Sequence, residues 1–391
     1  LTGFAVVGSR VDGDEYPDLL IGSPGVSAPG GGVESGEVRL FLGPLPSDIM
    51  GDADFIRTGS ADIAINGVGV NGHFGRSIAG GGDIDGDGLP DTVIGAHKLD
   101  RGSTADCGAV YIFRGDRPDW EDSITISADD YDAKFYSDLK EMYFGQSLSF
   151  VGDTNGDDMD DLLIGAPNAP VDGIKTGAAM LVHGHATKFG AGAELRHTTA
   201  DAWYGGEAKD DEAGFTVAGL GDVDEDGRTE FAIGAPRNDN NGDDAGAVYI
   251  MLEPSLYGGK KYVLAESDIQ FYGTDDRDRM GLSPVQTADF NNDSVTDLIL
   301  GSPQIACPAA SCGKTFVFYG PIDDIESADL GSSEGSEHTS FRGMGMREFA
   351  GQAMLAGHDL GSDGIDDLVI SAPGASAGEA GTVHVVFGKG F

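Results

Sequence analysis

Residues 83–97 read DIDGDGLPDTVIGAH, an acidic loop that runs directly into a short apolar segment. The aspartates stand at loop positions 1, 3, 5 and 9: Asp83, Asp85, Asp87 and Asp91. Carboxylates this close together repel one another unless they are solvated or hold a cation. Gly88 at position 6 permits a left-handed turn, so the chain can curl around a central point. Oxygen ligands in a tight loop suit Ca²⁺, whereas zinc prefers Cys or His. The loop therefore predicts a calcium site, with a solvated acidic turn as the alternative.

The acidic loop recurs along the whole chain at a nearly constant spacing. Further copies start at Asp153, Asp222, Asp289 and Asp359, and a weaker first copy, RVDGDEYPDLLIGSP, starts at Arg10. We number these loops 1 to 6 in chain order. The position-9 acids are 67 to 73 residues apart: Asp18, Asp91, Asp161, Glu230, Asp297 and Asp367. A fixed period of this size indicates a repeat architecture, and six copies at one spacing argue against chance.

The repeat covers nearly all of the 391 residues, so it predicts one repeat domain, residues 1–391, although length alone suggests two or three domains. The repeats span approximately 1–72, 73–142, 143–212, 213–279, 280–348 and 349–391. The chain opens on GFAVVG without a basic leader, which predicts a mature form or an excised domain.

The charge balance limits the partners that the protein can have. The formal net charge of -42 argues against nucleic acid, whose phosphates need a basic surface, and against anionic lipid. No apolar stretch reaches the ~18 residues of a membrane span, so direct membrane insertion is not expected.

The three cysteines weakly favour an extracellular setting. Cys307 and Cys312 are close enough in sequence to close a small disulfide loop, and Cys107 is expected to be buried. Calcium loops favour the same setting more strongly, because extracellular Ca²⁺ is high enough to fill even weak sites.

Each repeat follows the same order of segments. A glycine lies eight residues before position 1 of loops 2 to 6: Gly75, Gly145, Gly214, Gly281 and Gly351. A short apolar stretch, the acidic loop, an apolar run such as LLIG, a third strand such as GAVYIF and a more polar fourth segment follow. Short apolar runs bounded by Gly and Pro are typical of buried strands. About four strands per repeat, six times over, predict an all-β fold, a β-propeller of four-stranded blades.

An EF-hand is excluded, although its loop also begins D-x-D-x-D-G. That motif needs a bidentate Glu at position 12 and flanking helices. Position 12 is apolar in all six loops: Ile21, Ile94, Ile164, Ile233, Leu300 and Ile370.

The flanks of the loops add a family resemblance. Phe-Gly precedes loops 2 and 3, and Gly-Ala-Pro follows loops 3 and 4 at residues 165–167 and 234–236. This pattern resembles the FG-GAP repeat of the integrin α-subunit β-propeller, over the full chain. The resemblance implies a Ca²⁺ ion held by the side chains at positions 1, 3, 5 and 9 and by the backbone carbonyl at position 7. The implied ligands of loops 2 to 6 are Asp83, Asp85, Asp87, Leu89 and Asp91; Asp153, Asn155, Asp157, Met159 and Asp161; Asp222, Asp224, Asp226, Arg228 and Glu230; Asp289, Asn291, Asp293, Val295 and Asp297; and Asp359, Asp363, Ile365 and Asp367.

Two loops depart from the pattern, and so does the blade count. Loop 1 keeps Asp12, Asp14 and Asp18 but has Arg10 at position 1, whose guanidinium can take the place of the cation, so this site is expected to be weak or empty. Loop 6 has Gly361 at position 3. Loops 2 to 5 are expected to bind best, with about 4–6 ions in all. The integrin propeller has seven blades, whereas this chain has six repeats and a short last one, so six blades are favoured and seven remain possible.

These features predict an extracellular, calcium-stabilised, integrin-α-like scaffold that binds an unknown protein or glycan and has no catalytic role. Catalytic constellations are poor in the sequence. The first rival is a non-catalytic domain of a larger secreted enzyme, joined to further domains. The second is a lectin-like binder of small ligands, for which Trp120 and Trp203 offer limited aromatic material. The tripeptide Arg114-Gly115-Asp116 can act as an adhesive signal, but here a chance match is favoured.

Overall fold

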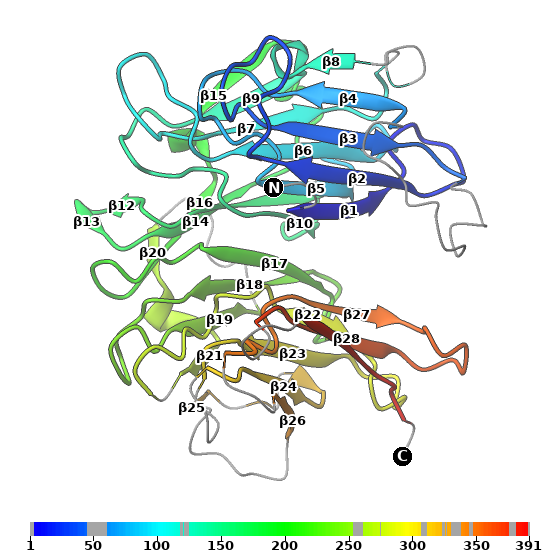
Figure 1. Cartoon of the computed structure of the whole chain (residues 1–391), viewed down its shortest axis with the longest axis vertical. Coiled ribbons are helices and arrows are strands. Elements are labelled where there is room, and N and C mark those ends of the chain that lie inside the picture. Colours follow the sequence, from blue (N-terminus) through cyan, green and yellow to red (C-terminus); the bar gives the residue numbers. More distant parts are fainter. Residues whose placement is uncertain are drawn as a thin grey trace. The chain divides into compact units, whose positions relative to one another are not determined.

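The computed structural model describes residues 4–44, 61–117, 120, 125–252, 261–273, 275–305, 311–322, 325, 327–329, 338–343, 347–374 and 381–389. Strands dominate this range, and the fold is an all-β propeller with six blade sheets, as predicted (Figure 1). Among the described residues, no helix is long and apolar enough to cross a membrane.

The chain forms two compact units. The first contains residues 1–169 and 180–201, and the second contains residues 170–179 and 202–391. The boundary falls inside the third repeat, where β14 (Ala178–Val182) is divided between the units.

The first unit holds the sheets of repeats 1 and 2 and the first hairpin of repeat 3. The sheet of repeat 1 has the order β1-β2-β3-β4-β8: Ala5–Ser9, Asp18–Ser23, Glu37–Phe41, Ile63–Asn66 and Thr125–Ser127. The sheet of repeat 2 has the order β5-β6-β7-β9-β15: Ser77–Gly82, Asp91–Ala96, Ala109–Phe113, Ala133–Tyr136 and Ala193–Arg196. In repeat 3, β10 (Leu148–Gly152) pairs antiparallel with β11 (Asp161–Ala166).

The second unit holds the sheets of repeats 4 to 6 and the outer part of repeat 3. In repeat 3, β16 (Ala202–Gly205) pairs parallel with β20 (Lys261–Val263), beside the small hairpin of β12 (Pro170–Val171) and β13 (Ile174–Lys175). Repeat 4 has the order β17-β18-β19-β21-β25: Thr216–Gly221, Glu230–Ala235, Ala247–Met251, Ile269–Tyr272 and Ala328–Asp329. Repeat 5 has the order β22-β23-β24-β26: Gln286–Ala288, Asp297–Ser302, Lys314–Phe318 and His338–Arg342. Repeat 6 has the order β27-β28-β29: Met354–His358, Asp367–Ala372 and Thr382–Val386.

A short fifth strand at the edge of several blades was not predicted. The polar segment before each new repeat supplies it, and it lies parallel to the fourth strand of the preceding repeat: β8 beside β4, β15 beside β9, β20 beside β16 and β25 beside β21. Three of these strands are followed by the single 3₁₀ turns η2 (Ala128–Asp130), η3 (His197–Thr199) and η5 (Leu264–Glu266). The added strand covers backbone groups at the edge, which would otherwise invite pairing with another chain.

The apolar runs form the core of each unit, as their pattern predicts. Strands β6, β7, β11 and β19 are buried on both faces. In the first unit, Leu20, Ile65, Phe74, Ile94 and Tyr111 belong to one cluster that joins the sheets of repeats 1 and 2. Neighbouring blades therefore share one core, which is how repeats that cannot bury an apolar face alone gain stability.

The two glycines of the repeat signature meet between neighbouring blades. A Cβ atom on Gly95, which follows β6's apolar run, would lie 2.3 Å from the carbonyl oxygen of Gly145, the glycine that opens the next repeat. The same contact joins Gly22 with Gly75, Gly234 with Gly281 and Gly301 with Gly351. Ser77 Oγ also donates to the Gly145 carbonyl (2.8 Å). The signature glycines therefore permit the close approach of one blade to the next.

Replacing Gly95 by Ala is expected to destabilise the first unit by about 1–3 kcal/mol, because the new methyl group overlaps the Gly145 backbone. Urea denaturation would measure the loss. Gly190→Ala is the matched control, because a Cβ atom there meets no atom within 4 Å and the residue has no positive φ. Equal stabilities of the two variants would contradict this account of the signature.

Candidate metal centres

Each of the six acidic loops joins the first and second strands of its blade. The position-9 acid is the first residue of the second strand in every case: β2, β6, β11, β18, β23 and β28 begin at Asp18, Asp91, Asp161, Glu230, Asp297 and Asp367. The predicted location of the loop within the repeat is therefore confirmed.

The position-9 acid is buried and ties three segments of its blade together. In loop 2, Asp91 Oδ2 accepts the backbone N–H of Ile84 (2.9 Å) and Asp91 Oδ1 accepts the backbone N–H of Gly115 (3.0 Å). Ile84 lies in the loop and Gly115 follows the third strand. The same pair of bonds to loop position 2 and to a glycine after the third strand recurs at Asp18, Asp161, Asp297 and Asp367. The spacing of these acids predicted a ligand role and did not predict this structural one, although the recurring glycine was a visible signal.

The carboxylates at positions 1 and 5 hold the curl of the loop. In loop 2, Asp83 accepts the backbone N–H groups of Gly86, Asp87 and Gly88 at 2.7, 3.1 and 2.8 Å. Asp87 accepts the N–H of Leu89 (2.9 Å). Asp153, Asp289 and Asp359 repeat the position-1 pattern. Aspartate side chains that bond backbone groups a few residues ahead fix a turn, so the predicted curl is present in the structure.

Carboxylate oxygens converge in three of the six loops. The groups are Asp83, Asp85 and Asp91 in loop 2, Asp222, Asp224 and Glu230 in loop 4, and Asp12, Asp14 and Asp18 in loop 1; one oxygen from each member lies within 4.8 Å of the others. In loops 3 and 5, position 3 is Asn155 or Asn291, and its amide donates to the position-5 carboxylate at 3.1 or 2.8 Å.

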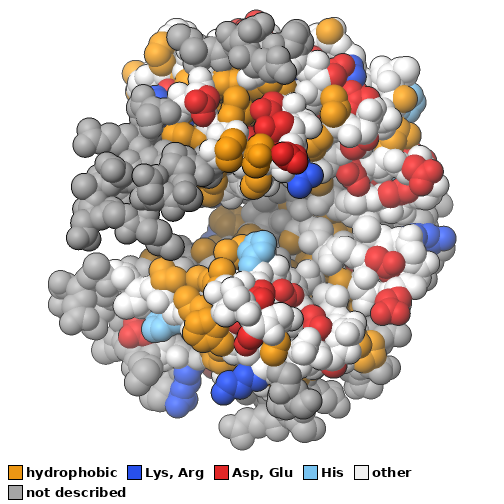
Figure 2. Space-filling model, turned by 90° about the vertical axis from the view of Figure 1, so that its right-hand side faces the viewer, with side chains coloured by type: hydrophobic (Ala, Val, Ile, Leu, Met, Phe, Trp, Pro, Cys, Tyr) orange, Lys and Arg blue, Asp and Glu red, His pale blue; other side chains and the backbone are white. Residues whose placement is uncertain are grey.

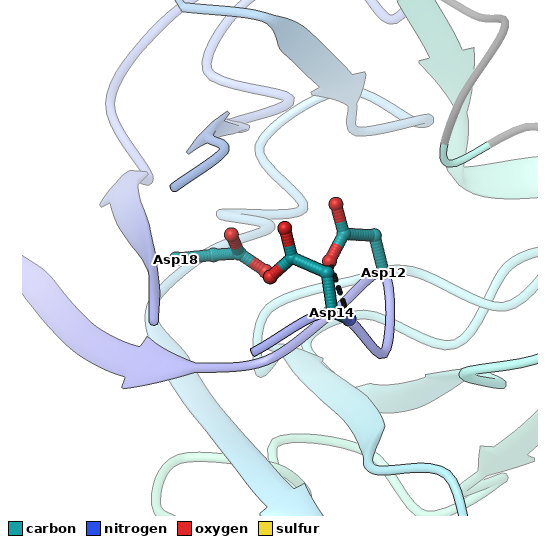
Figure 3. A group of neighbouring side chains, drawn as sticks. All are labelled: Asp12, Asp14 and Asp18. Atoms are coloured by element: carbon teal, nitrogen blue, oxygen red, sulfur yellow. Dashed lines mark hydrogen bonds between the residues drawn. The ribbon is translucent and has the colours of Figure 1, made fainter. Parts of the chain in front are cut away.

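Loop 1 gathers its carboxylates despite Arg10. Figure 3 shows the side chains of Asp12, Asp14 and Asp18 turned toward one another. Arg10 is exposed and forms no ion pair with them within the described part of the chain. The expectation of a weak or empty site in loop 1 remains a prediction, and it now rests on the missing position-1 carboxylate alone.

Within the six acidic loops, all of which the structure describes, two buried carboxylate oxygens have no hydrogen-bond partner. They are Asp85 Oδ1 in loop 2 and Glu230 Oε1 in loop 4. Burial raises the pKa of Asp91 to about 7, of Glu230 to about 8 and of Asp297 to about 6. A buried acceptor without a partner is costly, and ionised carboxylates packed together are costly as well. A bound cation would remove both costs, so the residues present fit Ca²⁺.

The calcium-free protein is expected to become more stable as the pH falls from about 8 towards about 5. Because Glu230 has a folded-state pKa of about 8 and an ordinary value of 4.5, the folded state takes up its proton first as the pH falls. This contribution to stability is present at low pH and is lost as the pH rises through the folded-state pKa. Denaturation curves in a chelator would measure it, and Glu230→Gln is expected to flatten the slope. The same slope in both proteins would contradict the assignment.

Arg114 brings a guanidinium group into loop 2. Its Nε lies 2.5 Å from Asp85 Oδ2, without hydrogen-bond alignment, and its Nη2 lies 3.2 Å from Asp87 Oδ2. The sequence predicted a guanidinium beside loop 1, that of Arg10, and did not predict this contact of Arg114 with loop 2. Gly115, the second residue of the Arg-Gly-Asp tripeptide, is buried, and its N–H donates to Asp91. The first two residues of the tripeptide are thus engaged in loop 2.

The structure also places the tryptophans and cysteines that the sequence singled out. Trp120 is buried and its indole N–H donates to the Arg114 carbonyl (2.8 Å), so it offers no open platform for a sugar ring. Trp203 is half-buried. Cys107 is a buried free thiol, as expected. Cys312 is disulfide-bonded, whereas Cys307 lies outside the described residues, so its pairing with Cys312 remains a prediction.

A fourth acidic group was missed by sequence analysis. Asp239, Asp243 and Asp244 gather in the connection between β18 and β19. Asp244 is paired with Arg237 (3.0 Å) and Arg279 (3.1 Å), so its charge is already compensated. Acidic side chains are also spread over the face shown in Figure 2, in keeping with the net charge of -42.

Comparison with known proteins places these loops in context. The model of the FG-GAP repeat matches residues 144–179, 213–251 and 350–386. The chain is 27% identical over 414 residues to a phosphatidylinositol-glycan-specific phospholipase D of Homo sapiens, covering 99% of this chain and 46% of that protein. It is 36% identical over 166 residues to integrin alpha-4 of Xenopus laevis, covering 42% of this chain and 14% of that protein. It is 26% identical over 247 residues to integrin alpha-5 of Xenopus laevis, covering 61% of this chain and 20% of that protein. The chain thus spans about half the length of the phospholipase relatives that it matches.

Proposed function

We propose that this protein is an extracellular scaffold whose blades are stabilised by Ca²⁺ and whose role is to bind a protein or glycan partner. The proposal proceeds from its FG-GAP repeats and its integrin-α-like propeller fold. The proposal gives the acidic loops a structural role. It gives no catalytic role to the described residues.

The observation that carries the calcium proposal is the pair of buried, unpartnered oxygens in loops whose other carboxylates already converge. Asp85 belongs to the converging group of loop 2, and Glu230 belongs to that of loop 4. Backbone N–H groups already saturate the position-1 and position-9 carboxylates on one side, which leaves the loop interior lined with acceptors. Hard oxygen acceptors without donors are what Ca²⁺ requires.

Calorimetric titration of the chelator-treated protein with Ca²⁺ would test the proposal. About four to six ions are expected to bind. Glu230→Gln and Asp85→Asn are each expected to remove one of them. The exposed surface change Lys209→Gln serves as the control, because Lys209 pairs with the neighbouring Asp210 and lies outside the six acidic loops. A chain that binds no Ca²⁺, or whose variants keep every site, would contradict the proposal.

A second candidate function is favoured by the share of this chain that one relative matches. The phospholipase relative matches 99% of this chain, whereas the integrin relatives match shorter parts. We therefore propose, as the alternative, that the chain is the non-catalytic propeller of a larger secreted enzyme. The isolated chain is then expected to release no protein from a phosphatidylinositol-glycan anchor. Release by the isolated chain would overturn its non-catalytic assignment in both settings.

A further inference from the structure

An acid at position 8 links two of the loops to the loop before them. Asp160 of loop 3 accepts the backbone N–H of Asp83 through Oδ2 (2.8 Å), and its own N–H donates to the Asp83 carbonyl (3.0 Å). Asp366 of loop 6 accepts the backbone N–H of Asp289 (3.1 Å) in the same way. Asp83 and Asp289 are the position-1 residues of loops 2 and 5. The position-8 acid therefore holds the residue around which the preceding loop curls.

A second bond joins the same pairs of loops. The N–H of His185, just after β14, donates to the Ile84 carbonyl in loop 2 (2.8 Å). The N–H of Lys389, just after β29, donates to the Phe290 carbonyl in loop 5 (3.3 Å). The two pairs lie in different units, so the arrangement occurs twice independently.

The other neighbouring loops within each unit lack this link. Position 8 is Pro90 in loop 2 and Thr296 in loop 5. A groove of about 490 Å³ lies between loops 1 and 2, lined by Asp14 and Pro90 among others. A groove of about 300 Å³ lies between loops 4 and 5, lined by Asp224 and Thr296 among others. The linked pairs of loops thus have an acid at position 8 of the second loop, and the unlinked pairs do not.

We propose that loops 2 and 3, and likewise loops 5 and 6, bind cations as coupled pairs through Asp160 and Asp366. This inference rests on the proposed calcium binding. Asp160 stands between Met159 and Asp161, two predicted ligands of loop 3. A cation in loop 3 fixes both neighbours and therefore fixes Asp160, which in turn holds the backbone of Asp83 in place for loop 2.

The sign of the coupling follows from the same contacts. Two cations in adjacent loops repel each other, but the Asp160 carboxylate places a negative charge between them and offsets the repulsion. Ordering Asp83 in advance lowers the cost of closing loop 2 on its ion. Occupancy of loop 3 therefore raises the affinity of loop 2, and occupancy of loop 2 raises that of loop 3 by the same factor.

Loop 2 can be observed by itself with Tb³⁺, a hard cation that takes the same oxygen ligands. The sequence has two tryptophans, and Trp120 is bonded through its indole N–H to the carbonyl of Arg114, whose side chain contacts loop 2. In a Trp203→Phe background, Tb³⁺ emission excited through tryptophan therefore reports the filling of loop 2.

The experiment is a double-mutant cycle. Asp157→Ala removes a predicted ligand of loop 3 and is expected to weaken Tb³⁺ binding at loop 2 about fivefold or more. In an Asp160→Ala background, the Asp157 change is expected to have no further effect on loop 2. Asp138→Asn removes an exposed carboxylate in the same unit that pairs with Arg196, outside both loops, and is expected to change nothing. If Asp160→Ala does not fold, Asp160→Asn keeps an oxygen for the Asp83 N–H and removes only the charge, and it is then expected to reduce the effect of the Asp157 change on loop 2 without abolishing it.

The outcomes separate this inference from the proposed function. A normal loop 2 titration in Asp157→Ala, with loop 3 binding lost by calorimetry, would overturn the coupling and leave calcium binding intact. Absence of both Tb³⁺ emission and calorimetric binding in the unsubstituted loops would overturn the proposed function itself.

Discussion

Removing calcium is expected to lower the melting temperature of the protein by about 10–20 °C. Binding to the folded state alone adds about 2.7 kcal/mol per site at a hundredfold excess of ligand over Kd. Four occupied sites shared by two units of roughly 200 residues would add about 5 kcal/mol to each unit. One kcal/mol shifts the melting temperature of a unit of this size by about 2–4 °C.

Thermal melts followed by circular dichroism, with Ca²⁺ and with a chelator at matched ionic strength, would measure this difference. Excess Mg²⁺ is the control, because it demands a tighter octahedral cage and keeps several of its waters. It is expected to restore only part of the loss. Coincident melting curves with and without Ca²⁺ would leave the loops as acidic turns.

Replacing Asp91 by Ala is expected to destabilise the calcium-free protein by about 2–4 kcal/mol. The change removes the acceptor of two buried N–H groups, those of Ile84 and Gly115, and each buried group left without a partner costs about 1–3 kcal/mol. Relief of the buried charge offsets part of this loss, because burial raises the pKa of Asp91 to about 7. The effect concerns the blade itself and is therefore measured in a chelator.

Asp87→Ala is the matched control in the same loop. Its carboxylate accepts two exposed bonds, from the N–H of Leu89 and from Arg114 Nη2, so its removal in chelator is expected to cost less than about 1 kcal/mol. In Ca²⁺ both variants are expected to lose the loop 2 ion. Equal losses of stability for the two variants in chelator would show that position 9 acts only as a ligand and does not tie the blade together.

Much of the fold could be read from local sequence. The alternation of short apolar runs with the acidic loop predicted the hairpin at each of the six loops, and the regular spacing predicted the blades. The curl of the loop could also be predicted, because an aspartate such as Asp83 bonds backbone groups only a few residues ahead. The fifth strand was missed because a segment as short and polar as β8 gains its pairing only from the edge of the preceding blade.

For the candidate sites, the sequence likewise predicted which residues belong to each loop. It did not predict the contacts that these residues make with other parts of the chain. Spacing named the carboxylates of loop 2, but the contact of Arg114 with Asp85 joins residues from the loop and from the end of the third strand. The contact of Arg114 with Asp85 forms only because the end of the third strand lies beside the loop. The same holds for the bond from Gly115 to Asp91, whose glycine is visible in the sequence while its target is not.

The sequence by itself determined the hairpin at each acidic loop and the carboxylates that line it, because these depend on contacts within about ten residues. The tertiary structure alone decided which loops are linked. Asp160 reaches Asp83 across 77 residues, and Ser77 reaches Gly145 across 68. Such contacts form only when one blade packs against the next. That packing depends on the shape of the shared core, which no local pattern in either repeat records.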